Sequence, residues 1–343
     1  MLRSGRISTA LLAFAALFAV ATACTAGSGG GGGEPSVLAA GKRLQVVTTV
    51  APITSIVANV GGDLIDLSGV VPEGTNSHTF EPPPSAARVL SQADVIFLNG
   101  LQLEDPTQEL AEENGKRGSE IVHLGDRTVA PDEYLYDFSF PRSGGKPNPH
   151  AWTNPPMAKQ YARIAADTFS RRDPTNAGAY RANYDRFAVR VDELDRAMAT
   201  ATATLAPERR KLLTYHDAYA YFARHYGWTV IGAIQPSSFE EPTAREVADL
   251  ITQVRREGVP AIFGSEVFPS PVLAQIGREA GVRYVDVLRD DDLPGKPGDP
   301  DHSWLGLMRF DYVTMVEALG GDASALKAVG VEDTAPDRAR YPQ

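Results

Sequence analysis

The sequence predicts an α/β protein with two lobes, each built on a mostly parallel sheet, joined by one long bridging helix. Three observations support this prediction. Short runs of branched and aromatic residues alternate along the chain with segments of helical period. One much longer helical pattern, at 176–205, interrupts the alternation. The length of 343 residues suits about two domains of ordinary size.

The composition is that of a globular protein. Hydrophobic residues make up 43% of the chain and charged residues 22%. Basic residues number 33 against 43 acidic ones, and the net charge of −10 argues against a nucleic-acid-binding surface. Cys24 is the only cysteine, which excludes intramolecular disulfides, cysteine zinc sites and iron–sulfur clusters. Any bound metal must therefore be held by histidines and carboxylates.

Residues 1–23 have the layout of an export signal. Arg3 and Arg6 precede an apolar run at 11–20, and small residues lead into Cys24. The run is shorter than the ~20 apolar residues of a membrane-spanning helix. This layout resembles a bacterial lipoprotein signal, whose cysteine is acylated after cleavage; the alternative is a plain secreted protein. We expect an extracytoplasmic protein, lipid-anchored at Cys24 or periplasmic.

A glycine-rich tether and a first lobe follow. Residues 24–43 contain a run of five glycines at 29–33 and no apolar periodicity, which predicts a flexible spacer. Residues 44–175 then form the N-terminal lobe. The clearest expected strands there lie at 44–50, 64–71 and 94–99, and an expected helix lies at 85–92.

The helical pattern at 176–205 links the lobes. Its apolar residues recur at spacings of four and three, which places them on one helix face. They are Tyr180, Tyr184, Phe187, Val191, Leu194 and Met198. Pro207 closes the pattern. A helix on the order of 40 Å long would cross both lobes; the alternative is a surface helix of a single domain.

The second lobe, residues 206–326, repeats the alternation of strands and helices. Its expected strands lie at 212–215, 229–234, 261–264 and 283–288, and an expected helix lies at 243–257. The remaining residues, 327–343, form a polar tail that we expect to be loose.

Four side chains in loops form a candidate metal site. His78, His216 and Asp291 each follow a predicted strand, the place where open α/β sheets bind ligands. His150 lies in a turn-rich loop between prolines. Three neutral imidazoles and one carboxylate suit Zn²⁺ and are acceptable to other divalent transition ions.

The other three histidines receive no metal in this interpretation. His225 lies inside a helical stretch and His123 at a strand edge, so both are expected to be structural. His302 lies in an Asp-rich loop, and we expect it to be solvent-exposed; a gate or spare ligand is the alternative.

Motifs around these residues resemble those of a known family. They are His78-Thr-Phe-Glu-Pro-Pro-Pro-Ser85, Ala93-Asp-Val-Ile-Phe-Leu-Asn-Gly100, Asn148-Pro-His-Ala-Trp152, Tyr215-His-Asp-Ala-Tyr-Ala-Tyr-Phe222 and Asp291-Asp-Leu293. In this order they are similar to the segments of the zinc- and manganese-binding receptors of bacterial ABC importers, the cluster A-I solute-binding proteins. The resemblance extends over about residues 44–325.

The resemblance implies two α/β lobes bridged by a helix, with the metal in the cleft between them. It implies the ligands His78, His150, His216 and an aspartate at the position of Asp291. Manganese-binding members tend to carry glutamate at the third ligand, so His216 favours Zn²⁺, with Mn²⁺ as the alternative.

Two departures from the family affect the site. Many zinc-binding members carry a histidine-rich loop before the second ligand, whereas residues 133–146 contain no histidine. The last motif reads Asp290-Asp-Asp-Leu293 in place of Thr-Asp-Ser-Leu. The carboxylate could therefore be Asp290 or Asp292, and Glu266 is a further candidate.

We expect a metal receptor and not an enzyme. Four protein ligands leave no open position for an activated water, and the sequence has no nucleophile-elbow, zincin or Walker motif.

The resemblance implies an ABC permease with a cytoplasmic ATPase as partner, with a metallochaperone as a further candidate. We expect a monomer that binds no nucleic acid. The alternatives are a manganese receptor, a zinc-dependent hydrolase and an adhesin with the same fold. Zinc affinity should fall below about pH 6.5, where imidazoles protonate.

Overall fold

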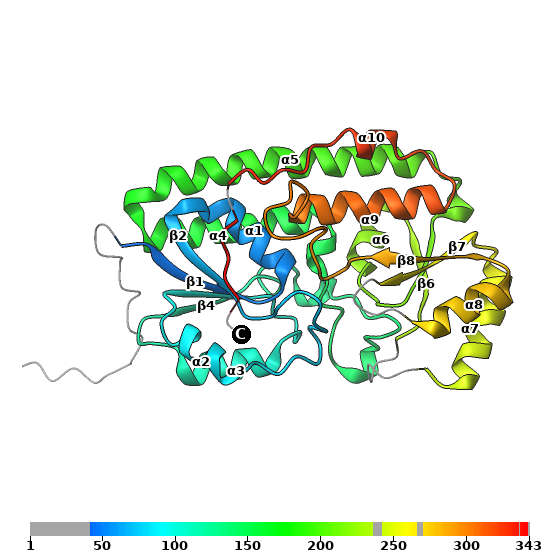
Figure 1. The fold of residues 1–343 in the computed structure, drawn as a ribbon, viewed down its shortest axis with the longest axis horizontal. Helices are drawn as coiled ribbons and strands as arrows, with labels where there is room; N and C mark the ends of the chain where they lie inside the picture. Colours follow the sequence, from blue (N-terminus) through cyan, green and yellow to red (C-terminus); the bar gives the residue numbers. More distant parts are fainter. Residues whose placement is uncertain (1–41, 236–241, 266–269, 336, 342–343) are drawn as a thin grey trace, which may run out of the picture. The chain divides into compact units, whose positions relative to one another are not determined.

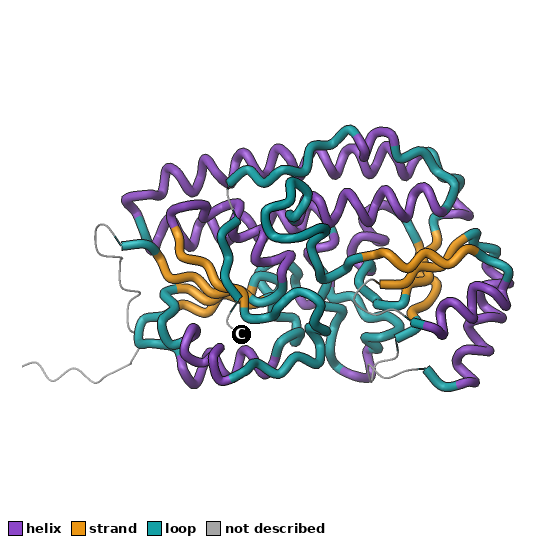
Figure 2. Tube along the Cα trace, viewed as in Figure 1, coloured by secondary structure: helices purple, strands orange, loops and turns teal. Residues whose placement is uncertain are grey.

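The fold contains two four-stranded parallel sheets, one in each lobe, flanked by helices (Figures 1 and 2). The structure, a computed structural model, describes residues 42–235, 242–265, 270–335 and 337–341, which all belong to one compact unit, Glu34–Gln343. The predicted export signal, Cys24 and the tether up to residue 41 lie outside the described residues. No described helix is long and apolar enough to cross a membrane. The predicted α/β architecture is confirmed.

The sheet of the first lobe has the strand order β2-β1-β3-β4. The strands are Leu44–Thr48 (β1), Ile65–Gly69 (β2), Val95–Leu98 (β3) and Glu120–His123 (β4). Strand β3 is buried throughout because helices cover both faces of the sheet. The predicted strands do not include β4, although His123 is placed at a strand edge; the polar residues at both ends of β4 hide its short apolar stretch.

The second lobe repeats this topology with the order β6-β5-β7-β8. Its strands are Lys211–Thr214 (β5), Thr229–Ala233 (β6), Ala261–Ser265 (β7) and Arg283–Leu288 (β8), and the sequence predicts all four. In both sheets the second strand lies on one side of the first and the third strand on the other. The loops that leave the carboxyl ends of neighbouring strands therefore run in opposite directions and leave a crevice between them. Open α/β sheets bind ligands in such crevices.

Helices connect consecutive strands within each lobe, and further helices follow the last strand of each sheet. Those of the first lobe are Ala51–Gly61 (α1), Pro84–Leu90 (α2), Asp105–Asn114 (α3) and Pro155–Arg172 (α4). Those of the second are Ala220–Tyr226 (α6), Ala244–Glu257 (α7), Pro271–Ala280 (α8), Trp304–Ala318 (α9) and Ser324–Lys327 (α10). Helix α7 begins where the sequence indicates, because Thr243 and Glu246 form a capping box.

The predicted long helix is α5, Ala177–Ala203. It runs along both lobes and packs on α1, α4 and α9 (Figure 1). Five residues of its apolar stripe are buried, and Tyr184 is partly buried. At 1.5 Å per residue the helix is about 40 Å long, enough to bridge the lobes. The bridging helix is therefore confirmed, while the lobe boundaries at residues 175 and 206 stay predictions.

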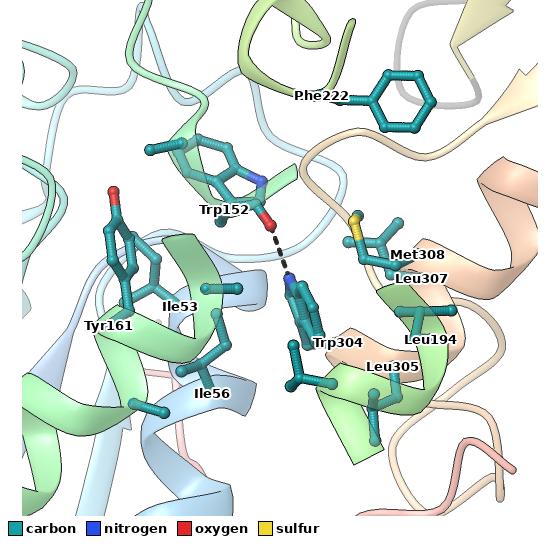
Figure 3. Packing of buried hydrophobic residues seen from close by; sticks show 14 of the residues in the cluster. Ile53, Ile56, Trp152, Tyr161, Leu194, Phe222, Trp304, Leu305, Leu307 and Met308 are labelled. Carbon is teal, nitrogen blue, oxygen red and sulfur yellow. Dashed lines mark hydrogen bonds between the residues drawn. The ribbon is translucent and has the colours of Figure 1, made fainter. Parts of the chain in front are cut away.

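One apolar core continues from the first lobe into the second beneath α5. At its centre, the indole nitrogen of Trp304 on α9 donates to the carbonyl oxygen of Trp152 at 3.0 Å (Figure 3). Ile53 and Ile56 of α1 lie on one side of this pair, and Leu194 of α5 lies on the other (Figure 3). Separating the lobes would expose this shared core to water, so large opening motions are costly.

The tail after α10 is packed, which contradicts the prediction that it is loose. Val329 and Val331 are buried, and Asn59 on α1 accepts a 2.7 Å hydrogen bond from the Thr334 N–H. The backbone of Arg340 makes hydrogen bonds of 2.9 and 3.1 Å with the exposed edge of β2. The polar composition of the tail does not indicate this packing, because backbone hydrogen bonds and only a few apolar side chains hold the tail in place.

Candidate metal centre

Four loops bring the predicted ligands together. His78 follows β2, His150 lies between β4 and α4, His216 follows β5 and Asp291 follows β8. Each lobe supplies two of the four loops, so the site lies where the lobes meet. Each residue presents one potential ligand atom, and these atoms all lie within 4.8 Å of one another.

The three imidazoles converge through their Nε2 atoms. The Nε2–Nε2 distances are 2.8 Å for His150 and His216, 3.2 Å for His78 and His150, and 3.3 Å for His78 and His216. Two nitrogens bound tetrahedrally to zinc at about 2.0–2.1 Å lie roughly 3.4 Å apart. Asp291 Oδ1 lies 4.0 Å from His150 Nε2, slightly beyond that spacing. The donor atoms are thus close to the arrangement that a tetrahedral ion requires.

A buried amide orients His150. Asn148 Oδ1 lies 2.8 Å from His150 Nδ1. The amide nitrogen of Asn148 donates to Asp137 Oδ2 and to the Asp217 carbonyl, so the amide oxygen is the atom that faces the ring. Because that oxygen only accepts, His150 carries its hydrogen on Nδ1 and directs the Nε2 lone pair to the centre.

Gln235 orients His216 in the same way. Its Oε1 lies 2.8 Å from His216 Nδ1, which directs the His216 Nε2 toward the other two imidazoles. The position of His216 follows from the end of β5, where the Thr214 hydroxyl donates to the His216 carbonyl at 2.7 Å. The sequence offers no local signal for Gln235, which lies 19 residues away from its partner.

Two asparagines shape the histidine loops of the first lobe. Asn76 Oδ1 accepts the His78 N–H at 3.0 Å, and Asn148 Oδ1 accepts the His150 N–H at 3.0 Å. Such Asx turns fix the backbone around the second following residue. Neither asparagine is among the predicted site residues, although each lies two positions before its histidine in the sequence.

The carboxylate near the histidines is Asp291. Its Oδ2 accepts a 2.7 Å hydrogen bond from the Ser77 hydroxyl of the first lobe. Its Oδ1 is buried, makes no hydrogen bond and lies on the side of the histidines. The further candidate Glu266 lies outside the described residues.

The flanking aspartates have other partners. Asp290 Oδ1 and Asp311 Oδ2 lie 2.7 and 2.8 Å from the hydroxyl of Tyr219. Burial raises the pKa of Asp290 to about 6 and that of Asp311 to about 8, so this cluster holds a proton at neutral pH. Asp292 accepts the Gly74 N–H at 2.8 Å. Neither Asp290 nor Asp292 joins the convergent group.

Burial also sets the protonation of the site. It lowers the pKa of His78 and His150 well below the ordinary imidazole value, and the positive charge of a neighbouring histidine adds to the effect. Both rings are therefore neutral at neutral pH. Burial raises the pKa of Asp291, opposed by His216 and the Ser77 hydroxyl. A bound cation would stabilise the carboxylate and offset the cost of burying it.

Of the other histidines, His225 matches the prediction. It lies partly exposed on α6, 2.8 Å from Asp195. His123 ends the edge strand β4. The expectation that His302 is solvent-exposed is wrong, since it is only 9% exposed. Its Nδ1 lies 3.1 Å from the Pro294 carbonyl and its Nε2 3.3 Å from Glu73 of the first lobe.

Residues 46–318 match the family described as Zinc-uptake complex component A periplasmic (ZnuA). The chain belongs to this family. The chain is 26% identical over 314 residues to "Metal ABC transporter substrate-binding lipoprotein FimA" of Streptococcus parasanguinis, covering 92% of this chain and 99% of FimA. It is 25% identical over 315 residues to "Iron-binding protein YfeA" of Yersinia pestis, covering 92% and 99%.

A solved structure has the same fold. The Cd-bound periplasmic metal-binding protein from Candidatus Liberibacter asiaticus matches with a TM-score of 0.71 at 25% identity, covering 81% of this chain and 100% of that one. Members of the zinc-uptake component A family are extracytoplasmic metal receptors of ABC importers and not enzymes. The hydrolase alternative is therefore set aside. FimA is named for a metal in general and YfeA for iron, so the metal of this chain is argued from its own donor atoms.

Proposed function

We propose that this member of the zinc-uptake component A family is a high-affinity zinc receptor that delivers Zn²⁺ to an ABC permease. The observation that carries the proposal is the convergence of His78, His150, His216 and Asp291 within 4.8 Å. Three imidazole nitrogens and one carboxylate oxygen complete a four-coordinate zinc site. Manganese favours six oxygen-rich ligands, which this donor set does not supply.

Binding and release follow from the division of the site between the lobes. Each lobe alone supplies two ligands, so the ion stabilises the arrangement in which the lobes meet. The continuous core beneath α5 keeps this motion small. Release then depends on a membrane permease, driven by a cytoplasmic ATPase, that separates the two pairs of ligands.

The chain would reach that permease as a lipid-anchored monomer. Acylation of Cys24 and the glycine-rich tether at 24–43 would hold the receptor near the membrane surface. This part of the proposal rests on the sequence pattern and on the description of FimA as a lipoprotein. An adhesin role and a metallochaperone form no part of the proposal.

The test is metal binding by the soluble form, residues 25–343. Zinc and manganese affinities would be measured by competition with a chelating dye for the wild type, His216→Ala and His225→Ala. We expect tight binding of one zinc ion by the wild type, loss of tight binding in His216→Ala, and no change in His225→Ala, since His225 faces Asp195 on the protein surface.

Each outcome bears on the proposal. Equal losses in the two variants would contradict the ligand assignment. Preference of the wild type for manganese in direct competition would replace zinc by manganese as the cargo. In cells, poor growth of a deletion strain at low zinc, rescued by added zinc, would support delivery to a permease.

A further inference from the structure

Phe140 packs on two of the proposed ligands. The centroid of its ring lies 5.4 Å from that of His78 and 5.6 Å from that of His150. The residue is only 7% exposed, although it lies in a connecting segment without a strand or long helix. The neighbouring residue Phe138, in contrast, is 49% exposed. The segment therefore turns one phenylalanine toward the metal centre and the other toward solvent.

Contacts with the second lobe fix this segment in place. A turn closes between the Asp137 N–H and the Phe140 carbonyl at 2.9 Å. The Ser139 N–H donates to Asp217 Oδ2 at 3.0 Å, and the Ser139 hydroxyl donates to the Gln235 carbonyl. Asp217 is the residue after the ligand His216, and Gln235 orients that ligand. Ser139 of the first lobe thus contacts both the residue that follows His216 and the residue that orients its ring.

Phe140 lines a surface pocket that reaches the proposed ligand His78. The pocket has a volume of about 560 Å³, and His78, Ser139, Phe140 and Pro149 contribute to its lining. The Phe140 side chain lines this pocket and also contacts the histidine rings. Truncating it would enlarge the pocket on the side of the histidine rings and admit more water to the donor atoms.

We propose that Phe140 is a specificity-determining residue that closes the metal centre against water and so favours a four-coordinate ion. The inference rests on the proposed function and deepens it. Zinc is satisfied by four protein ligands, whereas Mn²⁺ favours six-coordination with oxygen ligands. An apolar ring over the centre withholds the waters that Mn²⁺ would add. The cover thus penalises Mn²⁺ more than Zn²⁺.

The first experiment compares Phe140→Ala with two controls. Phe140→Leu keeps an apolar cover, and Phe138→Ala removes the same type of side chain from the exposed position nearby. Affinities for Zn²⁺ and Mn²⁺ would be measured by dye competition. We expect the ratio of the Mn²⁺ to the Zn²⁺ dissociation constant to fall about tenfold or more in Phe140→Ala, as added water lets Mn²⁺ approach its preferred coordination. Both controls should stay within about twofold of the wild type.

A spectroscopic measurement separates this role from a merely structural one. Tetrahedral Co²⁺ absorbs visible light far more strongly than octahedral Co²⁺. The Co²⁺-loaded wild type and both controls should show the strong bands, and Phe140→Ala should lose intensity as water raises the coordination number. An unchanged metal ratio and unchanged bands in a folded Phe140→Ala protein would overturn the proposal.

The wild type supplies a measurement that does not depend on a variant folding. If Phe140 excludes water, the Mn²⁺-loaded wild type should show low water-proton relaxivity; high relaxivity from exchanging bound water would also overturn the proposal. Failure of the proposed function has a different signature, namely a wild type that does not bind zinc or a His216→Ala variant that keeps full affinity.

Discussion

Replacing Asn148 with alanine tests whether residues behind the histidines set the metal affinity. Asn148 is fully buried. Its Oδ1 accepts from Nδ1 and from the backbone N–H of His150, at 2.8 and 3.0 Å. Its amide nitrogen donates to Asp137 Oδ2 at 2.8 Å and to the Asp217 carbonyl at 2.7 Å. Alanine removes all four contacts, so the His150 ring loses the partner that fixes its orientation and tautomer.

The expected loss in zinc affinity is about 10–100-fold, the usual effect of removing a group that orients a metal ligand. This corresponds to roughly 1.4–2.8 kcal/mol of binding free energy. The free energy of unfolding should also fall, by about 1–3 kcal/mol, because buried polar groups lose their partners.

A matched control separates the two effects. Asn59 is also fully buried, and its amide donates to the Ser55 carbonyl at 3.0 Å and accepts from Thr334 at 2.7 Å. Asn59→Ala should lose stability with unchanged zinc affinity. Affinity would be measured by chelator competition and stability by urea unfolding of the metal-free protein. Zinc affinity within about twofold of the wild type in Asn148→Ala, or equal losses of affinity in both variants, would refute the reasoning.

Three further predictions concern pH and the tail. Burial raises the pKa of Glu104 to about 7, because the folded state favours the protonated carboxyl group. The resulting contribution to the free energy of unfolding is complete below the ordinary pKa of about 4.3 and is lost as pH rises through about 7. Urea unfolding of metal-free protein should show wild-type stability falling by about 3 kcal/mol relative to Glu104→Gln between pH 4 and 8, and a constant difference would contradict this. Arg340→Pro removes the N–H that donates to the edge of β2 at 3.1 Å, and the free energy of unfolding should fall by about 1–3 kcal/mol. Arg340→Ala keeps this N–H and should lose little stability. Equal melting temperatures of the two variants would argue against the pairing. Burial lowers the pKa of His78 and His150, so protons should compete with zinc for these rings mainly below pH 6.5. Titration calorimetry would measure the zinc affinity against pH. A steep loss of affinity between pH 7.5 and 6.5 would speak against burial of these rings.

Much of the fold is visible in local patterns. Seven of the eight strands and the bridging helix α5 are predictable because each has its own apolar periodicity. Strand β4 is not, because its apolar stretch is short and its end residues are polar. The tail is not, because its pairing partner lies far away in the chain. Arg340 pairs with β2, and nothing near Arg340 in the sequence indicates that edge.

The sequence likewise supplies the candidate donors but not their orientation. It indicates His78, His150 and His216 through their positions in loops, and it leaves three adjacent aspartates open. The tertiary structure points one oxygen of Asp291 at the histidines, because Ser77, 214 residues away, donates a hydrogen bond to the other oxygen. The tertiary structure also buries His302 against Glu73. The Asp-rich sequence around His302 gives no indication of this burial.

The sequence by itself thus determined the fold class, the chemistry of the donor atoms and the family resemblance, because these are written in residue type and local period. Only the tertiary structure decided which carboxylate faces the centre, which nitrogen of each oriented ring carries the proton and where Phe140 lies. These properties depend on contacts between distant segments, such as Gln235 with His216 and Ser139 with Asp217, and no local pattern specifies a contact whose two halves meet only after folding.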